Sequence, residues 1–257
     1  MWNTILVNPL LNTLVFLYHH TGSLGISIVI LTVIIRTLLI PVILPSIKSM
    51  KKQRELAPQI GKLRKKYKKD QQKLAKAQME LFKKHGINPA AGCLSQIAMI
   101  IVLIALFGVI RTFTLNGDIS SINSKIYFDS IKISEQTTID TNFWYLDLSK
   151  PDPYFILAVL VGLLQFVLSK MTMPAIKRGE KTAKNTPQKS DDLAYNMQQQ
   201  AMYFMPIMNF IIGVTLPSGV VLYILTTTIF TMSQTYIING PGGLKPWINK
   251  LKSGKRD

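Results

Sequence analysis

Arg36 is the only charged residue in an apolar run that covers about residues 22–45. This run is long enough to cross a bilayer, and an arginine near the centre of a spanning helix costs roughly 2.5–3.5 kcal/mol on insertion scales. No Asp or Glu lies in this run or in any later apolar run. We therefore expect Arg36 to be hydrated or held by polar side chains, and to attract an anion. The alternative is an arginine that snorkels to the inner interface, about nine residues or roughly 13 Å away.

The other polar residues in the middle of the apolar runs are uncharged: Thr32, Gln96, Gln165, Asn209 and Gln234. Each either joins two helices or, together with Arg36, lines a polar groove. These runs hold hydroxyl groups but no His, Asp or Glu, so nucleophile–base pairs, carboxylate pairs and metal ligands are missing there. Three histidines and the single Cys93 predict neither a metal site nor an internal disulfide. The sequence therefore predicts a protein that is not an enzyme and needs no cofactor.

The apolar residues, 48% of the 257, gather in runs instead of following an amphipathic period. This pattern predicts an all-α integral membrane protein. Five transmembrane helices are expected, at about residues 22–45, 90–110, 153–171, 201–215 and 218–238. Residues 1–20 are expected to form an interfacial amphipathic helix, with an uncleaved signal anchor as the alternative. Pro41 and Pro45 are expected to kink or loosen the end of the first span.

Residues 46–88 carry fourteen Lys and Arg against three Asp and Glu. They are predicted to form a basic helical hairpin in the cytoplasm. Its first helix extends to about Tyr67, with an interruption at Pro58. Its second helix begins after Asp70 as the N-cap and ends at Gly86. Such a hairpin suits anionic lipid headgroups. Nucleic acid is a weaker alternative, because aromatic side chains for base stacking are nearly absent.

The net charge of +17 is divided unevenly among the loops. The 46–88 and 172–199 loops and the tail 241–257 are basic, whereas the outer loop 111–151 holds five Asp and Glu. The positive-inside rule then places the N-terminus outside and the C-terminus in the cytoplasm. Membrane orientation accounts for most of the charge, so no specific nucleic-acid substrate is needed.

Three motifs in this order carry a resemblance: RTLLIPVILPSIKSMKKQRELAPQIGKLRKKYKKD, INPAAGCL and LPSGVVLY. The chain resembles the YidC/Oxa/Alb family of membrane protein insertases, over about residues 20–238. It looks like the short bacterial form, because only about twenty residues precede the first span. The resemblance implies a five-span core, residues 21–240, around a hydrophilic groove open to the cytoplasm, in the bacterial plasma membrane.

The resemblance also implies the groove residues. Arg36 matches the family's groove arginine, Thr32 and Gln165 match groove-lining polar positions, and Tyr223 matches one of an aromatic pair. Gln234 is expected to line the same groove. The chain departs from the family pattern at three positions near these residues: Ile224, Ser95 and Met99.

The implied function is insertion and folding of newly made integral membrane proteins. Nascent membrane proteins are the expected partners, with membrane lipids; the basic hairpin and tail are candidates for contact with the ribosome or the Sec translocon. The client's apolar segment would move along the lipid-facing side of the third and fifth spans. Two other functions stay open: a small-anion carrier or channel that uses Arg36, and an assembly factor without insertion activity.

Overall fold

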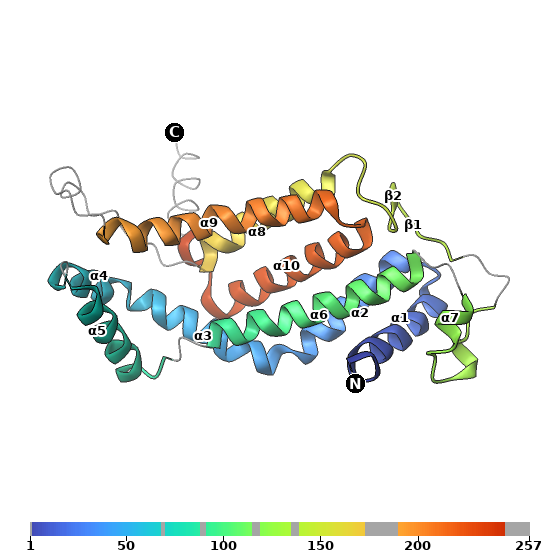
Figure 1. Ribbon diagram of the computed structural model, residues 1–257, viewed down its shortest axis with the longest axis horizontal. Coiled ribbons are helices and arrows are strands. Elements are labelled where there is room, and N and C mark those ends of the chain that lie inside the picture. Colours follow the sequence, from blue (N-terminus) through green and yellow to red (C-terminus); the bar gives the residue numbers. More distant parts are fainter. Residues whose placement is uncertain are drawn as a thin grey trace, which may run out of the picture. The chain divides into compact units, whose positions relative to one another are not determined.

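A computed structural model describes residues 2–67, 70–87, 91–114, 119–134, 139–172 and 190–244 (Figure 1). The described chain is mostly helical, which confirms the predicted all-α class. A π-helical turn, Asn3–Val7, precedes α1. The helices are α1 (Asn8–Thr21), α2 (Leu24–Leu38), α3 (Ile40–Glu55), α4 (Ala57–Lys66), α5 (Gln71–Lys84), α6 (Ala91–Thr114), α7 (Ile119–Asn123), α8 (Ile156–Thr172), α9 (Ser190–Thr215) and α10 (Ser218–Asn239). The described chain also has two strands of two residues each, β1 (Asn142–Phe143) and β2 (Leu146–Asp147). It has 3-10 turns at Asp129–Ile131 and Gly242–Leu244.

The chain divides into two compact units. The first comprises Met1–Ile40, Gln96–Leu164 and Ile207–Thr231, and the second comprises Pro41–Ser95, Gln165–Pro206 and Met232–Asp257. The boundaries fall inside α6, α8, α9 and α10, so each of these helices contributes residues to both units.

The first unit is built on one apolar core. α1 buries Leu11 and Leu14, α2 buries Leu24 and Ile28, and α10 buries Val221, all less than 2% exposed. The apolar face of α1 therefore packs on protein. Its predicted place at a membrane interface stays a prediction. Gly25 lies directly against the ring of Phe143 in β1, where no larger side chain fits.

The predicted first span, residues 22–45, is not one continuous helix. α2 ends at Leu38, and α3 begins at Ile40. Pro41 has no amide hydrogen to bond the carbonyl of Thr37, and the last bond of α2 runs from the amide of Leu39 to the carbonyl of Ile35 at 2.9 Å. The expected loosening near Pro41 is thus confirmed, whereas Pro45 lies inside α3.

The stretch of the predicted basic hairpin holds the end of α3 and the helices α4 and α5, and α4 and α5 are neighbouring helices of the second unit (Figure 1). α4 begins at Ala57, with Pro58 in its first turn. The carboxylate of Asp70 accepts a hydrogen bond of 3.0 Å from the amide of Lys73 and so caps α5. Gly86 follows α5 with a φ of +62°, a left-handed conformation that suits glycine.

Part of the predicted cytoplasmic loop 172–199 is helical. Residues 173–189 lie outside the described residues, but α9 already begins at Ser190 instead of about 201. The polar sequence of residues 190–199 hides this extension, although alanine, methionine and glutamine are good helix formers. Most of the predicted tail, from residue 245 on, also lies outside the described part.

In the described chain, α10 is the one single helix with the length and apolar character for crossing a membrane. α2 and α3 pass the same test as a pair broken at Leu39. Met99–Phe113, Ile156–Thr172 and Met202–Thr215 are shorter apolar segments. The structure therefore supports apolar helices at the predicted places, and the number of spans stays a prediction.

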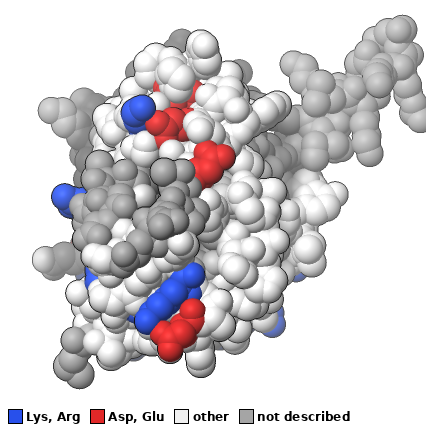
Figure 2. Space-filling view, turned by 90° about the vertical axis from the view of Figure 1, so that its right-hand side faces the viewer, with Lys and Arg blue, Asp and Glu red and all other residues white. Residues whose placement is uncertain are grey.

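The segment between α6 and α8, described at residues 119–134 and 139–155, carries both signs of charge, and Figure 2 shows acidic side chains next to basic ones. Lys132 pairs with Asp129 at 2.6 Å, and Lys150 pairs with Asp147 at 2.9 Å. The hydroxyl of Ser149 donates a 2.6 Å hydrogen bond to Asp147. This bond is the first cause that lowers the pKa of Asp147. The segment is thus ordered by local polar contacts.

Candidate functional site

Arg36 lies in the last turn of α2 and is 2% exposed. Its Nε donates to the hydroxyl of Thr227 on α10 at 3.4 Å, near the limit of a hydrogen bond. Its Nη2 is buried and has no hydrogen-bond partner in the described part of the chain. No ion pair joins Arg36 to a described carboxylate. The guanidinium is therefore poorly satisfied, and an acceptor from outside would complete its hydrogen bonds.

α10 supplies the polar side chains next to Arg36. Tyr223 is 3% exposed and lies within electrostatic range of the guanidinium. Tyr223 and Thr227 are four residues apart and so share one face of the helix. Thr226 and Thr228 donate their hydroxyl hydrogens to carbonyls of their own helix. Of the three consecutive threonines, Thr227 is the one directed toward Arg36.

Thr32 lies one turn before Arg36 on the same face of α2 and is fully buried. Its hydroxyl donates a 2.6 Å hydrogen bond to the carbonyl of Ile28. Such a bond within one helix leaves the threonine oxygen as an acceptor only. The structure thus brings Arg36, Thr32 and Tyr223 together in the first unit.

Gln165 and Gln234 belong to the second unit and are both half-buried. Gln165 lies on α8. Gln234 lies on α10, where its Oε1 is buried without a hydrogen-bond partner among the described residues. The same holds for Thr235 Oγ1 and Asn239 Oδ1. The C-terminal part of α10 therefore presents several unsatisfied polar atoms.

Two further polar residues were candidates from the sequence, Asn209 and Gln96. Asn209 is half-buried on α9, and the side chain of Gln96 lies outside the described residues. Of the three departures from the family pattern, Ile224 packs on the core of the first unit and Met99 is half-buried, whereas the side chain of Ser95 is outside the described part. No group of His, Cys, Asp and Glu among the described side chains has the arrangement of a metal site.

The turn between α9 and α10 is hydrogen-bonded to the segment between α6 and α8. Ser218 donates from its amide and from its hydroxyl to the carbonyl of Lys150, at 2.8 Å each. The amide of Gly219 donates to the carbonyl of Leu148 at 3.1 Å. These bonds fix the start of α10, and so the helix that carries Tyr223 and Thr227 beside Arg36.

Sequence reasoning missed a second arginine, Arg54 at the end of α3. Its Nη1 donates to the carbonyl of Met171 at 2.7 Å, and its Nη2 donates to the carbonyl of Asn239 at 3.3 Å. Met171 and Asn239 lie at the carboxyl ends of α8 and α10, where carbonyls lack partners and the helix dipole is negative. Within a stretch of fourteen basic residues, no sequence signal distinguishes Arg54.

Asp152 was missed as well. It is 1% exposed, and its carboxylate accepts hydrogen bonds from the amides of Leu157 at 2.7 Å and Tyr154 at 3.0 Å. An Asp before an apolar run is a typical helix-start signal, so this cap of α8 was open to prediction. Partial burial, and the neighbouring Asp152, raise the pKa of the Tyr145 hydroxyl.

These features first define a class: a mostly helical protein with apolar helices, a basic hairpin and a buried, incompletely paired arginine. Comparison with known proteins then identifies the family. The sequence model of the family described as "60Kd inner membrane protein" matches residues 16–242. The chain belongs to this family of bacterial inner-membrane proteins, the YidC/Oxa/Alb insertases.

Individual relatives agree with this assignment. The chain is 33% identical to membrane protein insertase YidC of Fusobacterium nucleatum, over 91% of this chain and 97% of that protein. It is 29% identical to membrane protein insertase MisCA of Bacillus subtilis, over 93% of this chain and 80% of that protein. It is 32% identical to YidC of Geobacter sulfurreducens over 93% of this chain, which spans 38% of that longer relative.

Proposed function

We propose that this chain inserts newly made proteins into the bacterial inner membrane and helps them fold. The observation that carries the proposal is the state of Arg36: a buried cation with one long contact and a free Nη2, in a chain of the insertase family. Removing a charge from water without a partner is costly. A residue kept in that state is suited to bind an acidic or polar client segment.

The proposed core is the five-span arrangement, residues 21–240, with the N-terminus outside and the C-terminus in the cytoplasm. Residues 1–20 would lie at the outer interface, and the tail 241–257 would lie in the cytoplasm. α8 has 17 residues, which is about 26 Å at 1.5 Å per residue. A hydrocarbon core is about 30 Å thick, so a helix of this length favours a locally thinned bilayer.

The proposed groove contains Arg36, Thr32, Gln165, Tyr223 and Gln234. Its support on α10 is the spacing of polar residues at 227, 231, 234 and 235, which lie on one face of a helix. Unsatisfied atoms on Gln234 and Thr235 favour contact with water or with a polar client. We expect this groove to open toward the cytoplasm.

The proposed mechanism is physical. Arg36 attracts the polar tail of the client, while the client's apolar segment moves along an exposed apolar face. α8 offers such a face, because its large exposed residues recur at spacings of three and four: Ile156, Val159, Leu160 and Leu163. Transfer of the segment into lipid provides the driving force, roughly 25 cal/mol per Å² of apolar surface. The mechanism requires neither a nucleotide nor a cofactor.

The proposed partners follow from charge. The basic hairpin α4–α5 and the basic tail would attract anionic lipid headgroups or the anionic RNA of a ribosome. The Sec translocon is the other candidate partner of these segments. Nucleic acid itself is not the proposed substrate.

The test uses liposomes that hold only the purified chain, wild type or Arg36→Ala, and a single-span client with an acidic translocated tail. Insertion is measured as protection of the tail from added protease, and chloride flux is measured in parallel. We expect protection with wild type, and at least about tenfold less with Arg36→Ala, which corresponds to about 1.4 kcal/mol. Chloride flux without protection of the tail would support the anion carrier. The absence of both flux and protection would favour an assembly factor.

A further inference from the structure

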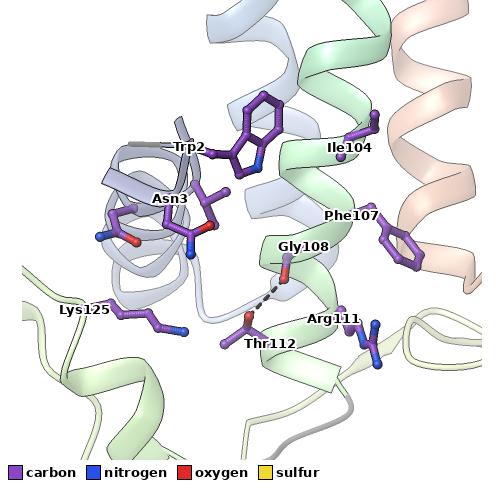
Figure 3. A pocket seen from close by; sticks show the side chains of 10 residues that line it. Trp2, Asn3, Ile104, Phe107, Gly108, Arg111, Thr112 and Lys125 are labelled. Carbon is purple, nitrogen blue, oxygen red and sulfur yellow. Dashed lines mark hydrogen bonds between the residues drawn. The ribbon is translucent and has the colours of Figure 1, made fainter. Parts of the chain in front are cut away.

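A cavity of about 500 Å³ lies within the first unit, between the N-terminal turn, α6 and the segment after α7 (Figure 3). It is separate from the proposed groove residues, none of which lines it. Trp2 and Ile104 lie at one end, and Lys125, Thr112 and Arg111 lie at the other (Figure 3). The cavity thus has an apolar end and a cationic end.

The wall that carries Lys125 is held in place by a buried amide. Asn12 of α1 is 7% exposed, and its Nδ2 donates to the carbonyl of Lys125 at 2.9 Å. Its Oδ1 accepts a 2.7 Å hydrogen bond from the amide of Tyr127. Asn12 therefore fixes the backbone around Lys125 against α1, and the ammonium extends toward Thr112 (Figure 3).

The two cations that line the cavity pair with none of the described carboxylates. Among the described basic residues of the segment between α6 and α8, Lys132 and Lys150 do form ion pairs. No Asp or Glu is among the described residues that line the cavity. Arg111 and Lys125 are both exposed, so their side chains can turn toward an anion. Asn3, also at the cavity, adds an amide donor.

The spacing of the apolar and basic residues along α6 suits a ligand with an anionic head and an apolar chain. Ile104, Phe107 and Arg111 fall on one face of the helix, and seven residues separate the first from the last, about 10 Å. Ile104 is 54% exposed, so the apolar end is open to an acyl chain. A free anion would use the cationic end only and leave Trp2 and Ile104 without a partner.

We propose that this cavity binds the phosphate headgroup of an anionic phospholipid, with one acyl chain along Ile104 and Phe107. Arg111 and Lys125 contact the phosphate, and Trp2 lies beside the chain as interfacial tryptophans do. The proposal rests on the membrane location of the chain. It does not depend on insertion activity, which the test below does not measure.

The test follows the fluorescence of Trp2 in the full chain with Trp144→Phe and Trp247→Phe, reconstituted in phosphatidylcholine vesicles. Phosphatidylglycerol with brominated acyl chains, which quench tryptophan, is added in rising mole fraction. We expect saturable quenching well above that given by brominated phosphatidylcholine. The Arg111→Gln/Lys125→Gln variant should need about thirtyfold more lipid, which corresponds to about 2 kcal/mol for the loss of two basic residues near a membrane surface.

Lys132→Gln is the matched control, because Lys132 lies on the same segment as Lys125, between α6 and α8, but pairs with Asp129. It should leave the quenching curve unchanged. Equal quenching by the two brominated lipids, or an unchanged curve in the double variant, would overturn the proposal. Complete displacement of the lipid by inorganic phosphate would also overturn it and assign the site to a free anion.

Discussion

Arg36 and Arg54 are two arginines with opposite surroundings, each within its own unit. Arg54 is half-buried and donates to two carbonyls at helix ends, at 2.7 and 3.3 Å. Arg36 is 2% exposed and has one hydroxyl at 3.4 Å, with Nη2 unpartnered among the described residues. The comparison separates two uses of the same side chain. The fold satisfies the donors of Arg54, whereas Arg36 keeps a donor available, as the proposed contact with a client requires.

The largest expected effect is a difference in thermal stability between two matched variants. Arg54→Met keeps most of the side-chain stem but removes a 2.7 Å hydrogen bond of a charged group, which contributes about 1.5–3 kcal/mol, and a weaker one at 3.3 Å. We expect a loss of about 2 kcal/mol and a Tm lower by about 4–8 °C in one detergent. Arg36→Met removes an incompletely paired charge and should leave Tm unchanged or raise it.

The measurement is thermal unfolding of the purified variants, followed by circular dichroism. Well below its Tm, where the protein is folded, the Arg54→Met variant should insert a client as well as wild type does. An Arg36→Met protein that unfolds earlier than Arg54→Met would contradict the comparison, since Arg36 would then be the structural residue.

A smaller effect on stability is expected from the hydrogen bond by which Asp70 caps α5 in the basic hairpin. The hydrogen bond from the Lys73 amide lowers the pKa of Asp70 below 3.8. Because the folded pKa is depressed, the cap stabilises α5 above the ordinary pKa and is lost as pH falls through the lowered one. NMR titration of the carboxyl carbon should therefore give a value below 3.8.

Hydrogen exchange of the Lys73 amide provides the matched comparison for this cap. Asp70→Ala should speed the exchange at neutral pH, and Asp70→Asn should retain most of the protection because asparagine also caps helices. An unshifted carboxyl pKa, together with unchanged exchange in Asp70→Ala, would sink the assigned cap.

Sequence predicted best what local chemistry decides. Asp70 and Gly86 are helix-end signals, so the bounds of α5 were predictable from nearby residues. The place of Arg36 in an apolar run predicted that water or polar side chains would surround it. The start of α9 at Ser190 was missed, because a polar helix has no apolar pattern to distinguish it from a loop.

Long-range partners were beyond the sequence. Thr227 is 191 residues from Arg36, and the neighbouring Thr226 and Thr228 have the same side chain. The choice among the three depends on how α10 is rotated against α2, which packing sets. For the same reason Arg54 was not distinguishable from the other basic residues around it: its acceptors lie 117 and 185 residues away.

The most direct test of the central claim is a double-mutant cycle between Arg36 and the client. A bacterium depleted of its own insertase carries this chain, wild type or Arg36→Ala, and a single-span client whose translocated tail is acidic or has each acid replaced by its amide. Membrane accumulation of both chains is measured as the control. Arg36→Ala should reduce insertion of the acidic client about tenfold and of the neutral client by less than about threefold, a coupling within the usual 0.5–3 kcal/mol. Equal losses for both clients, or none for either, would show that Arg36 does not receive the client's charge.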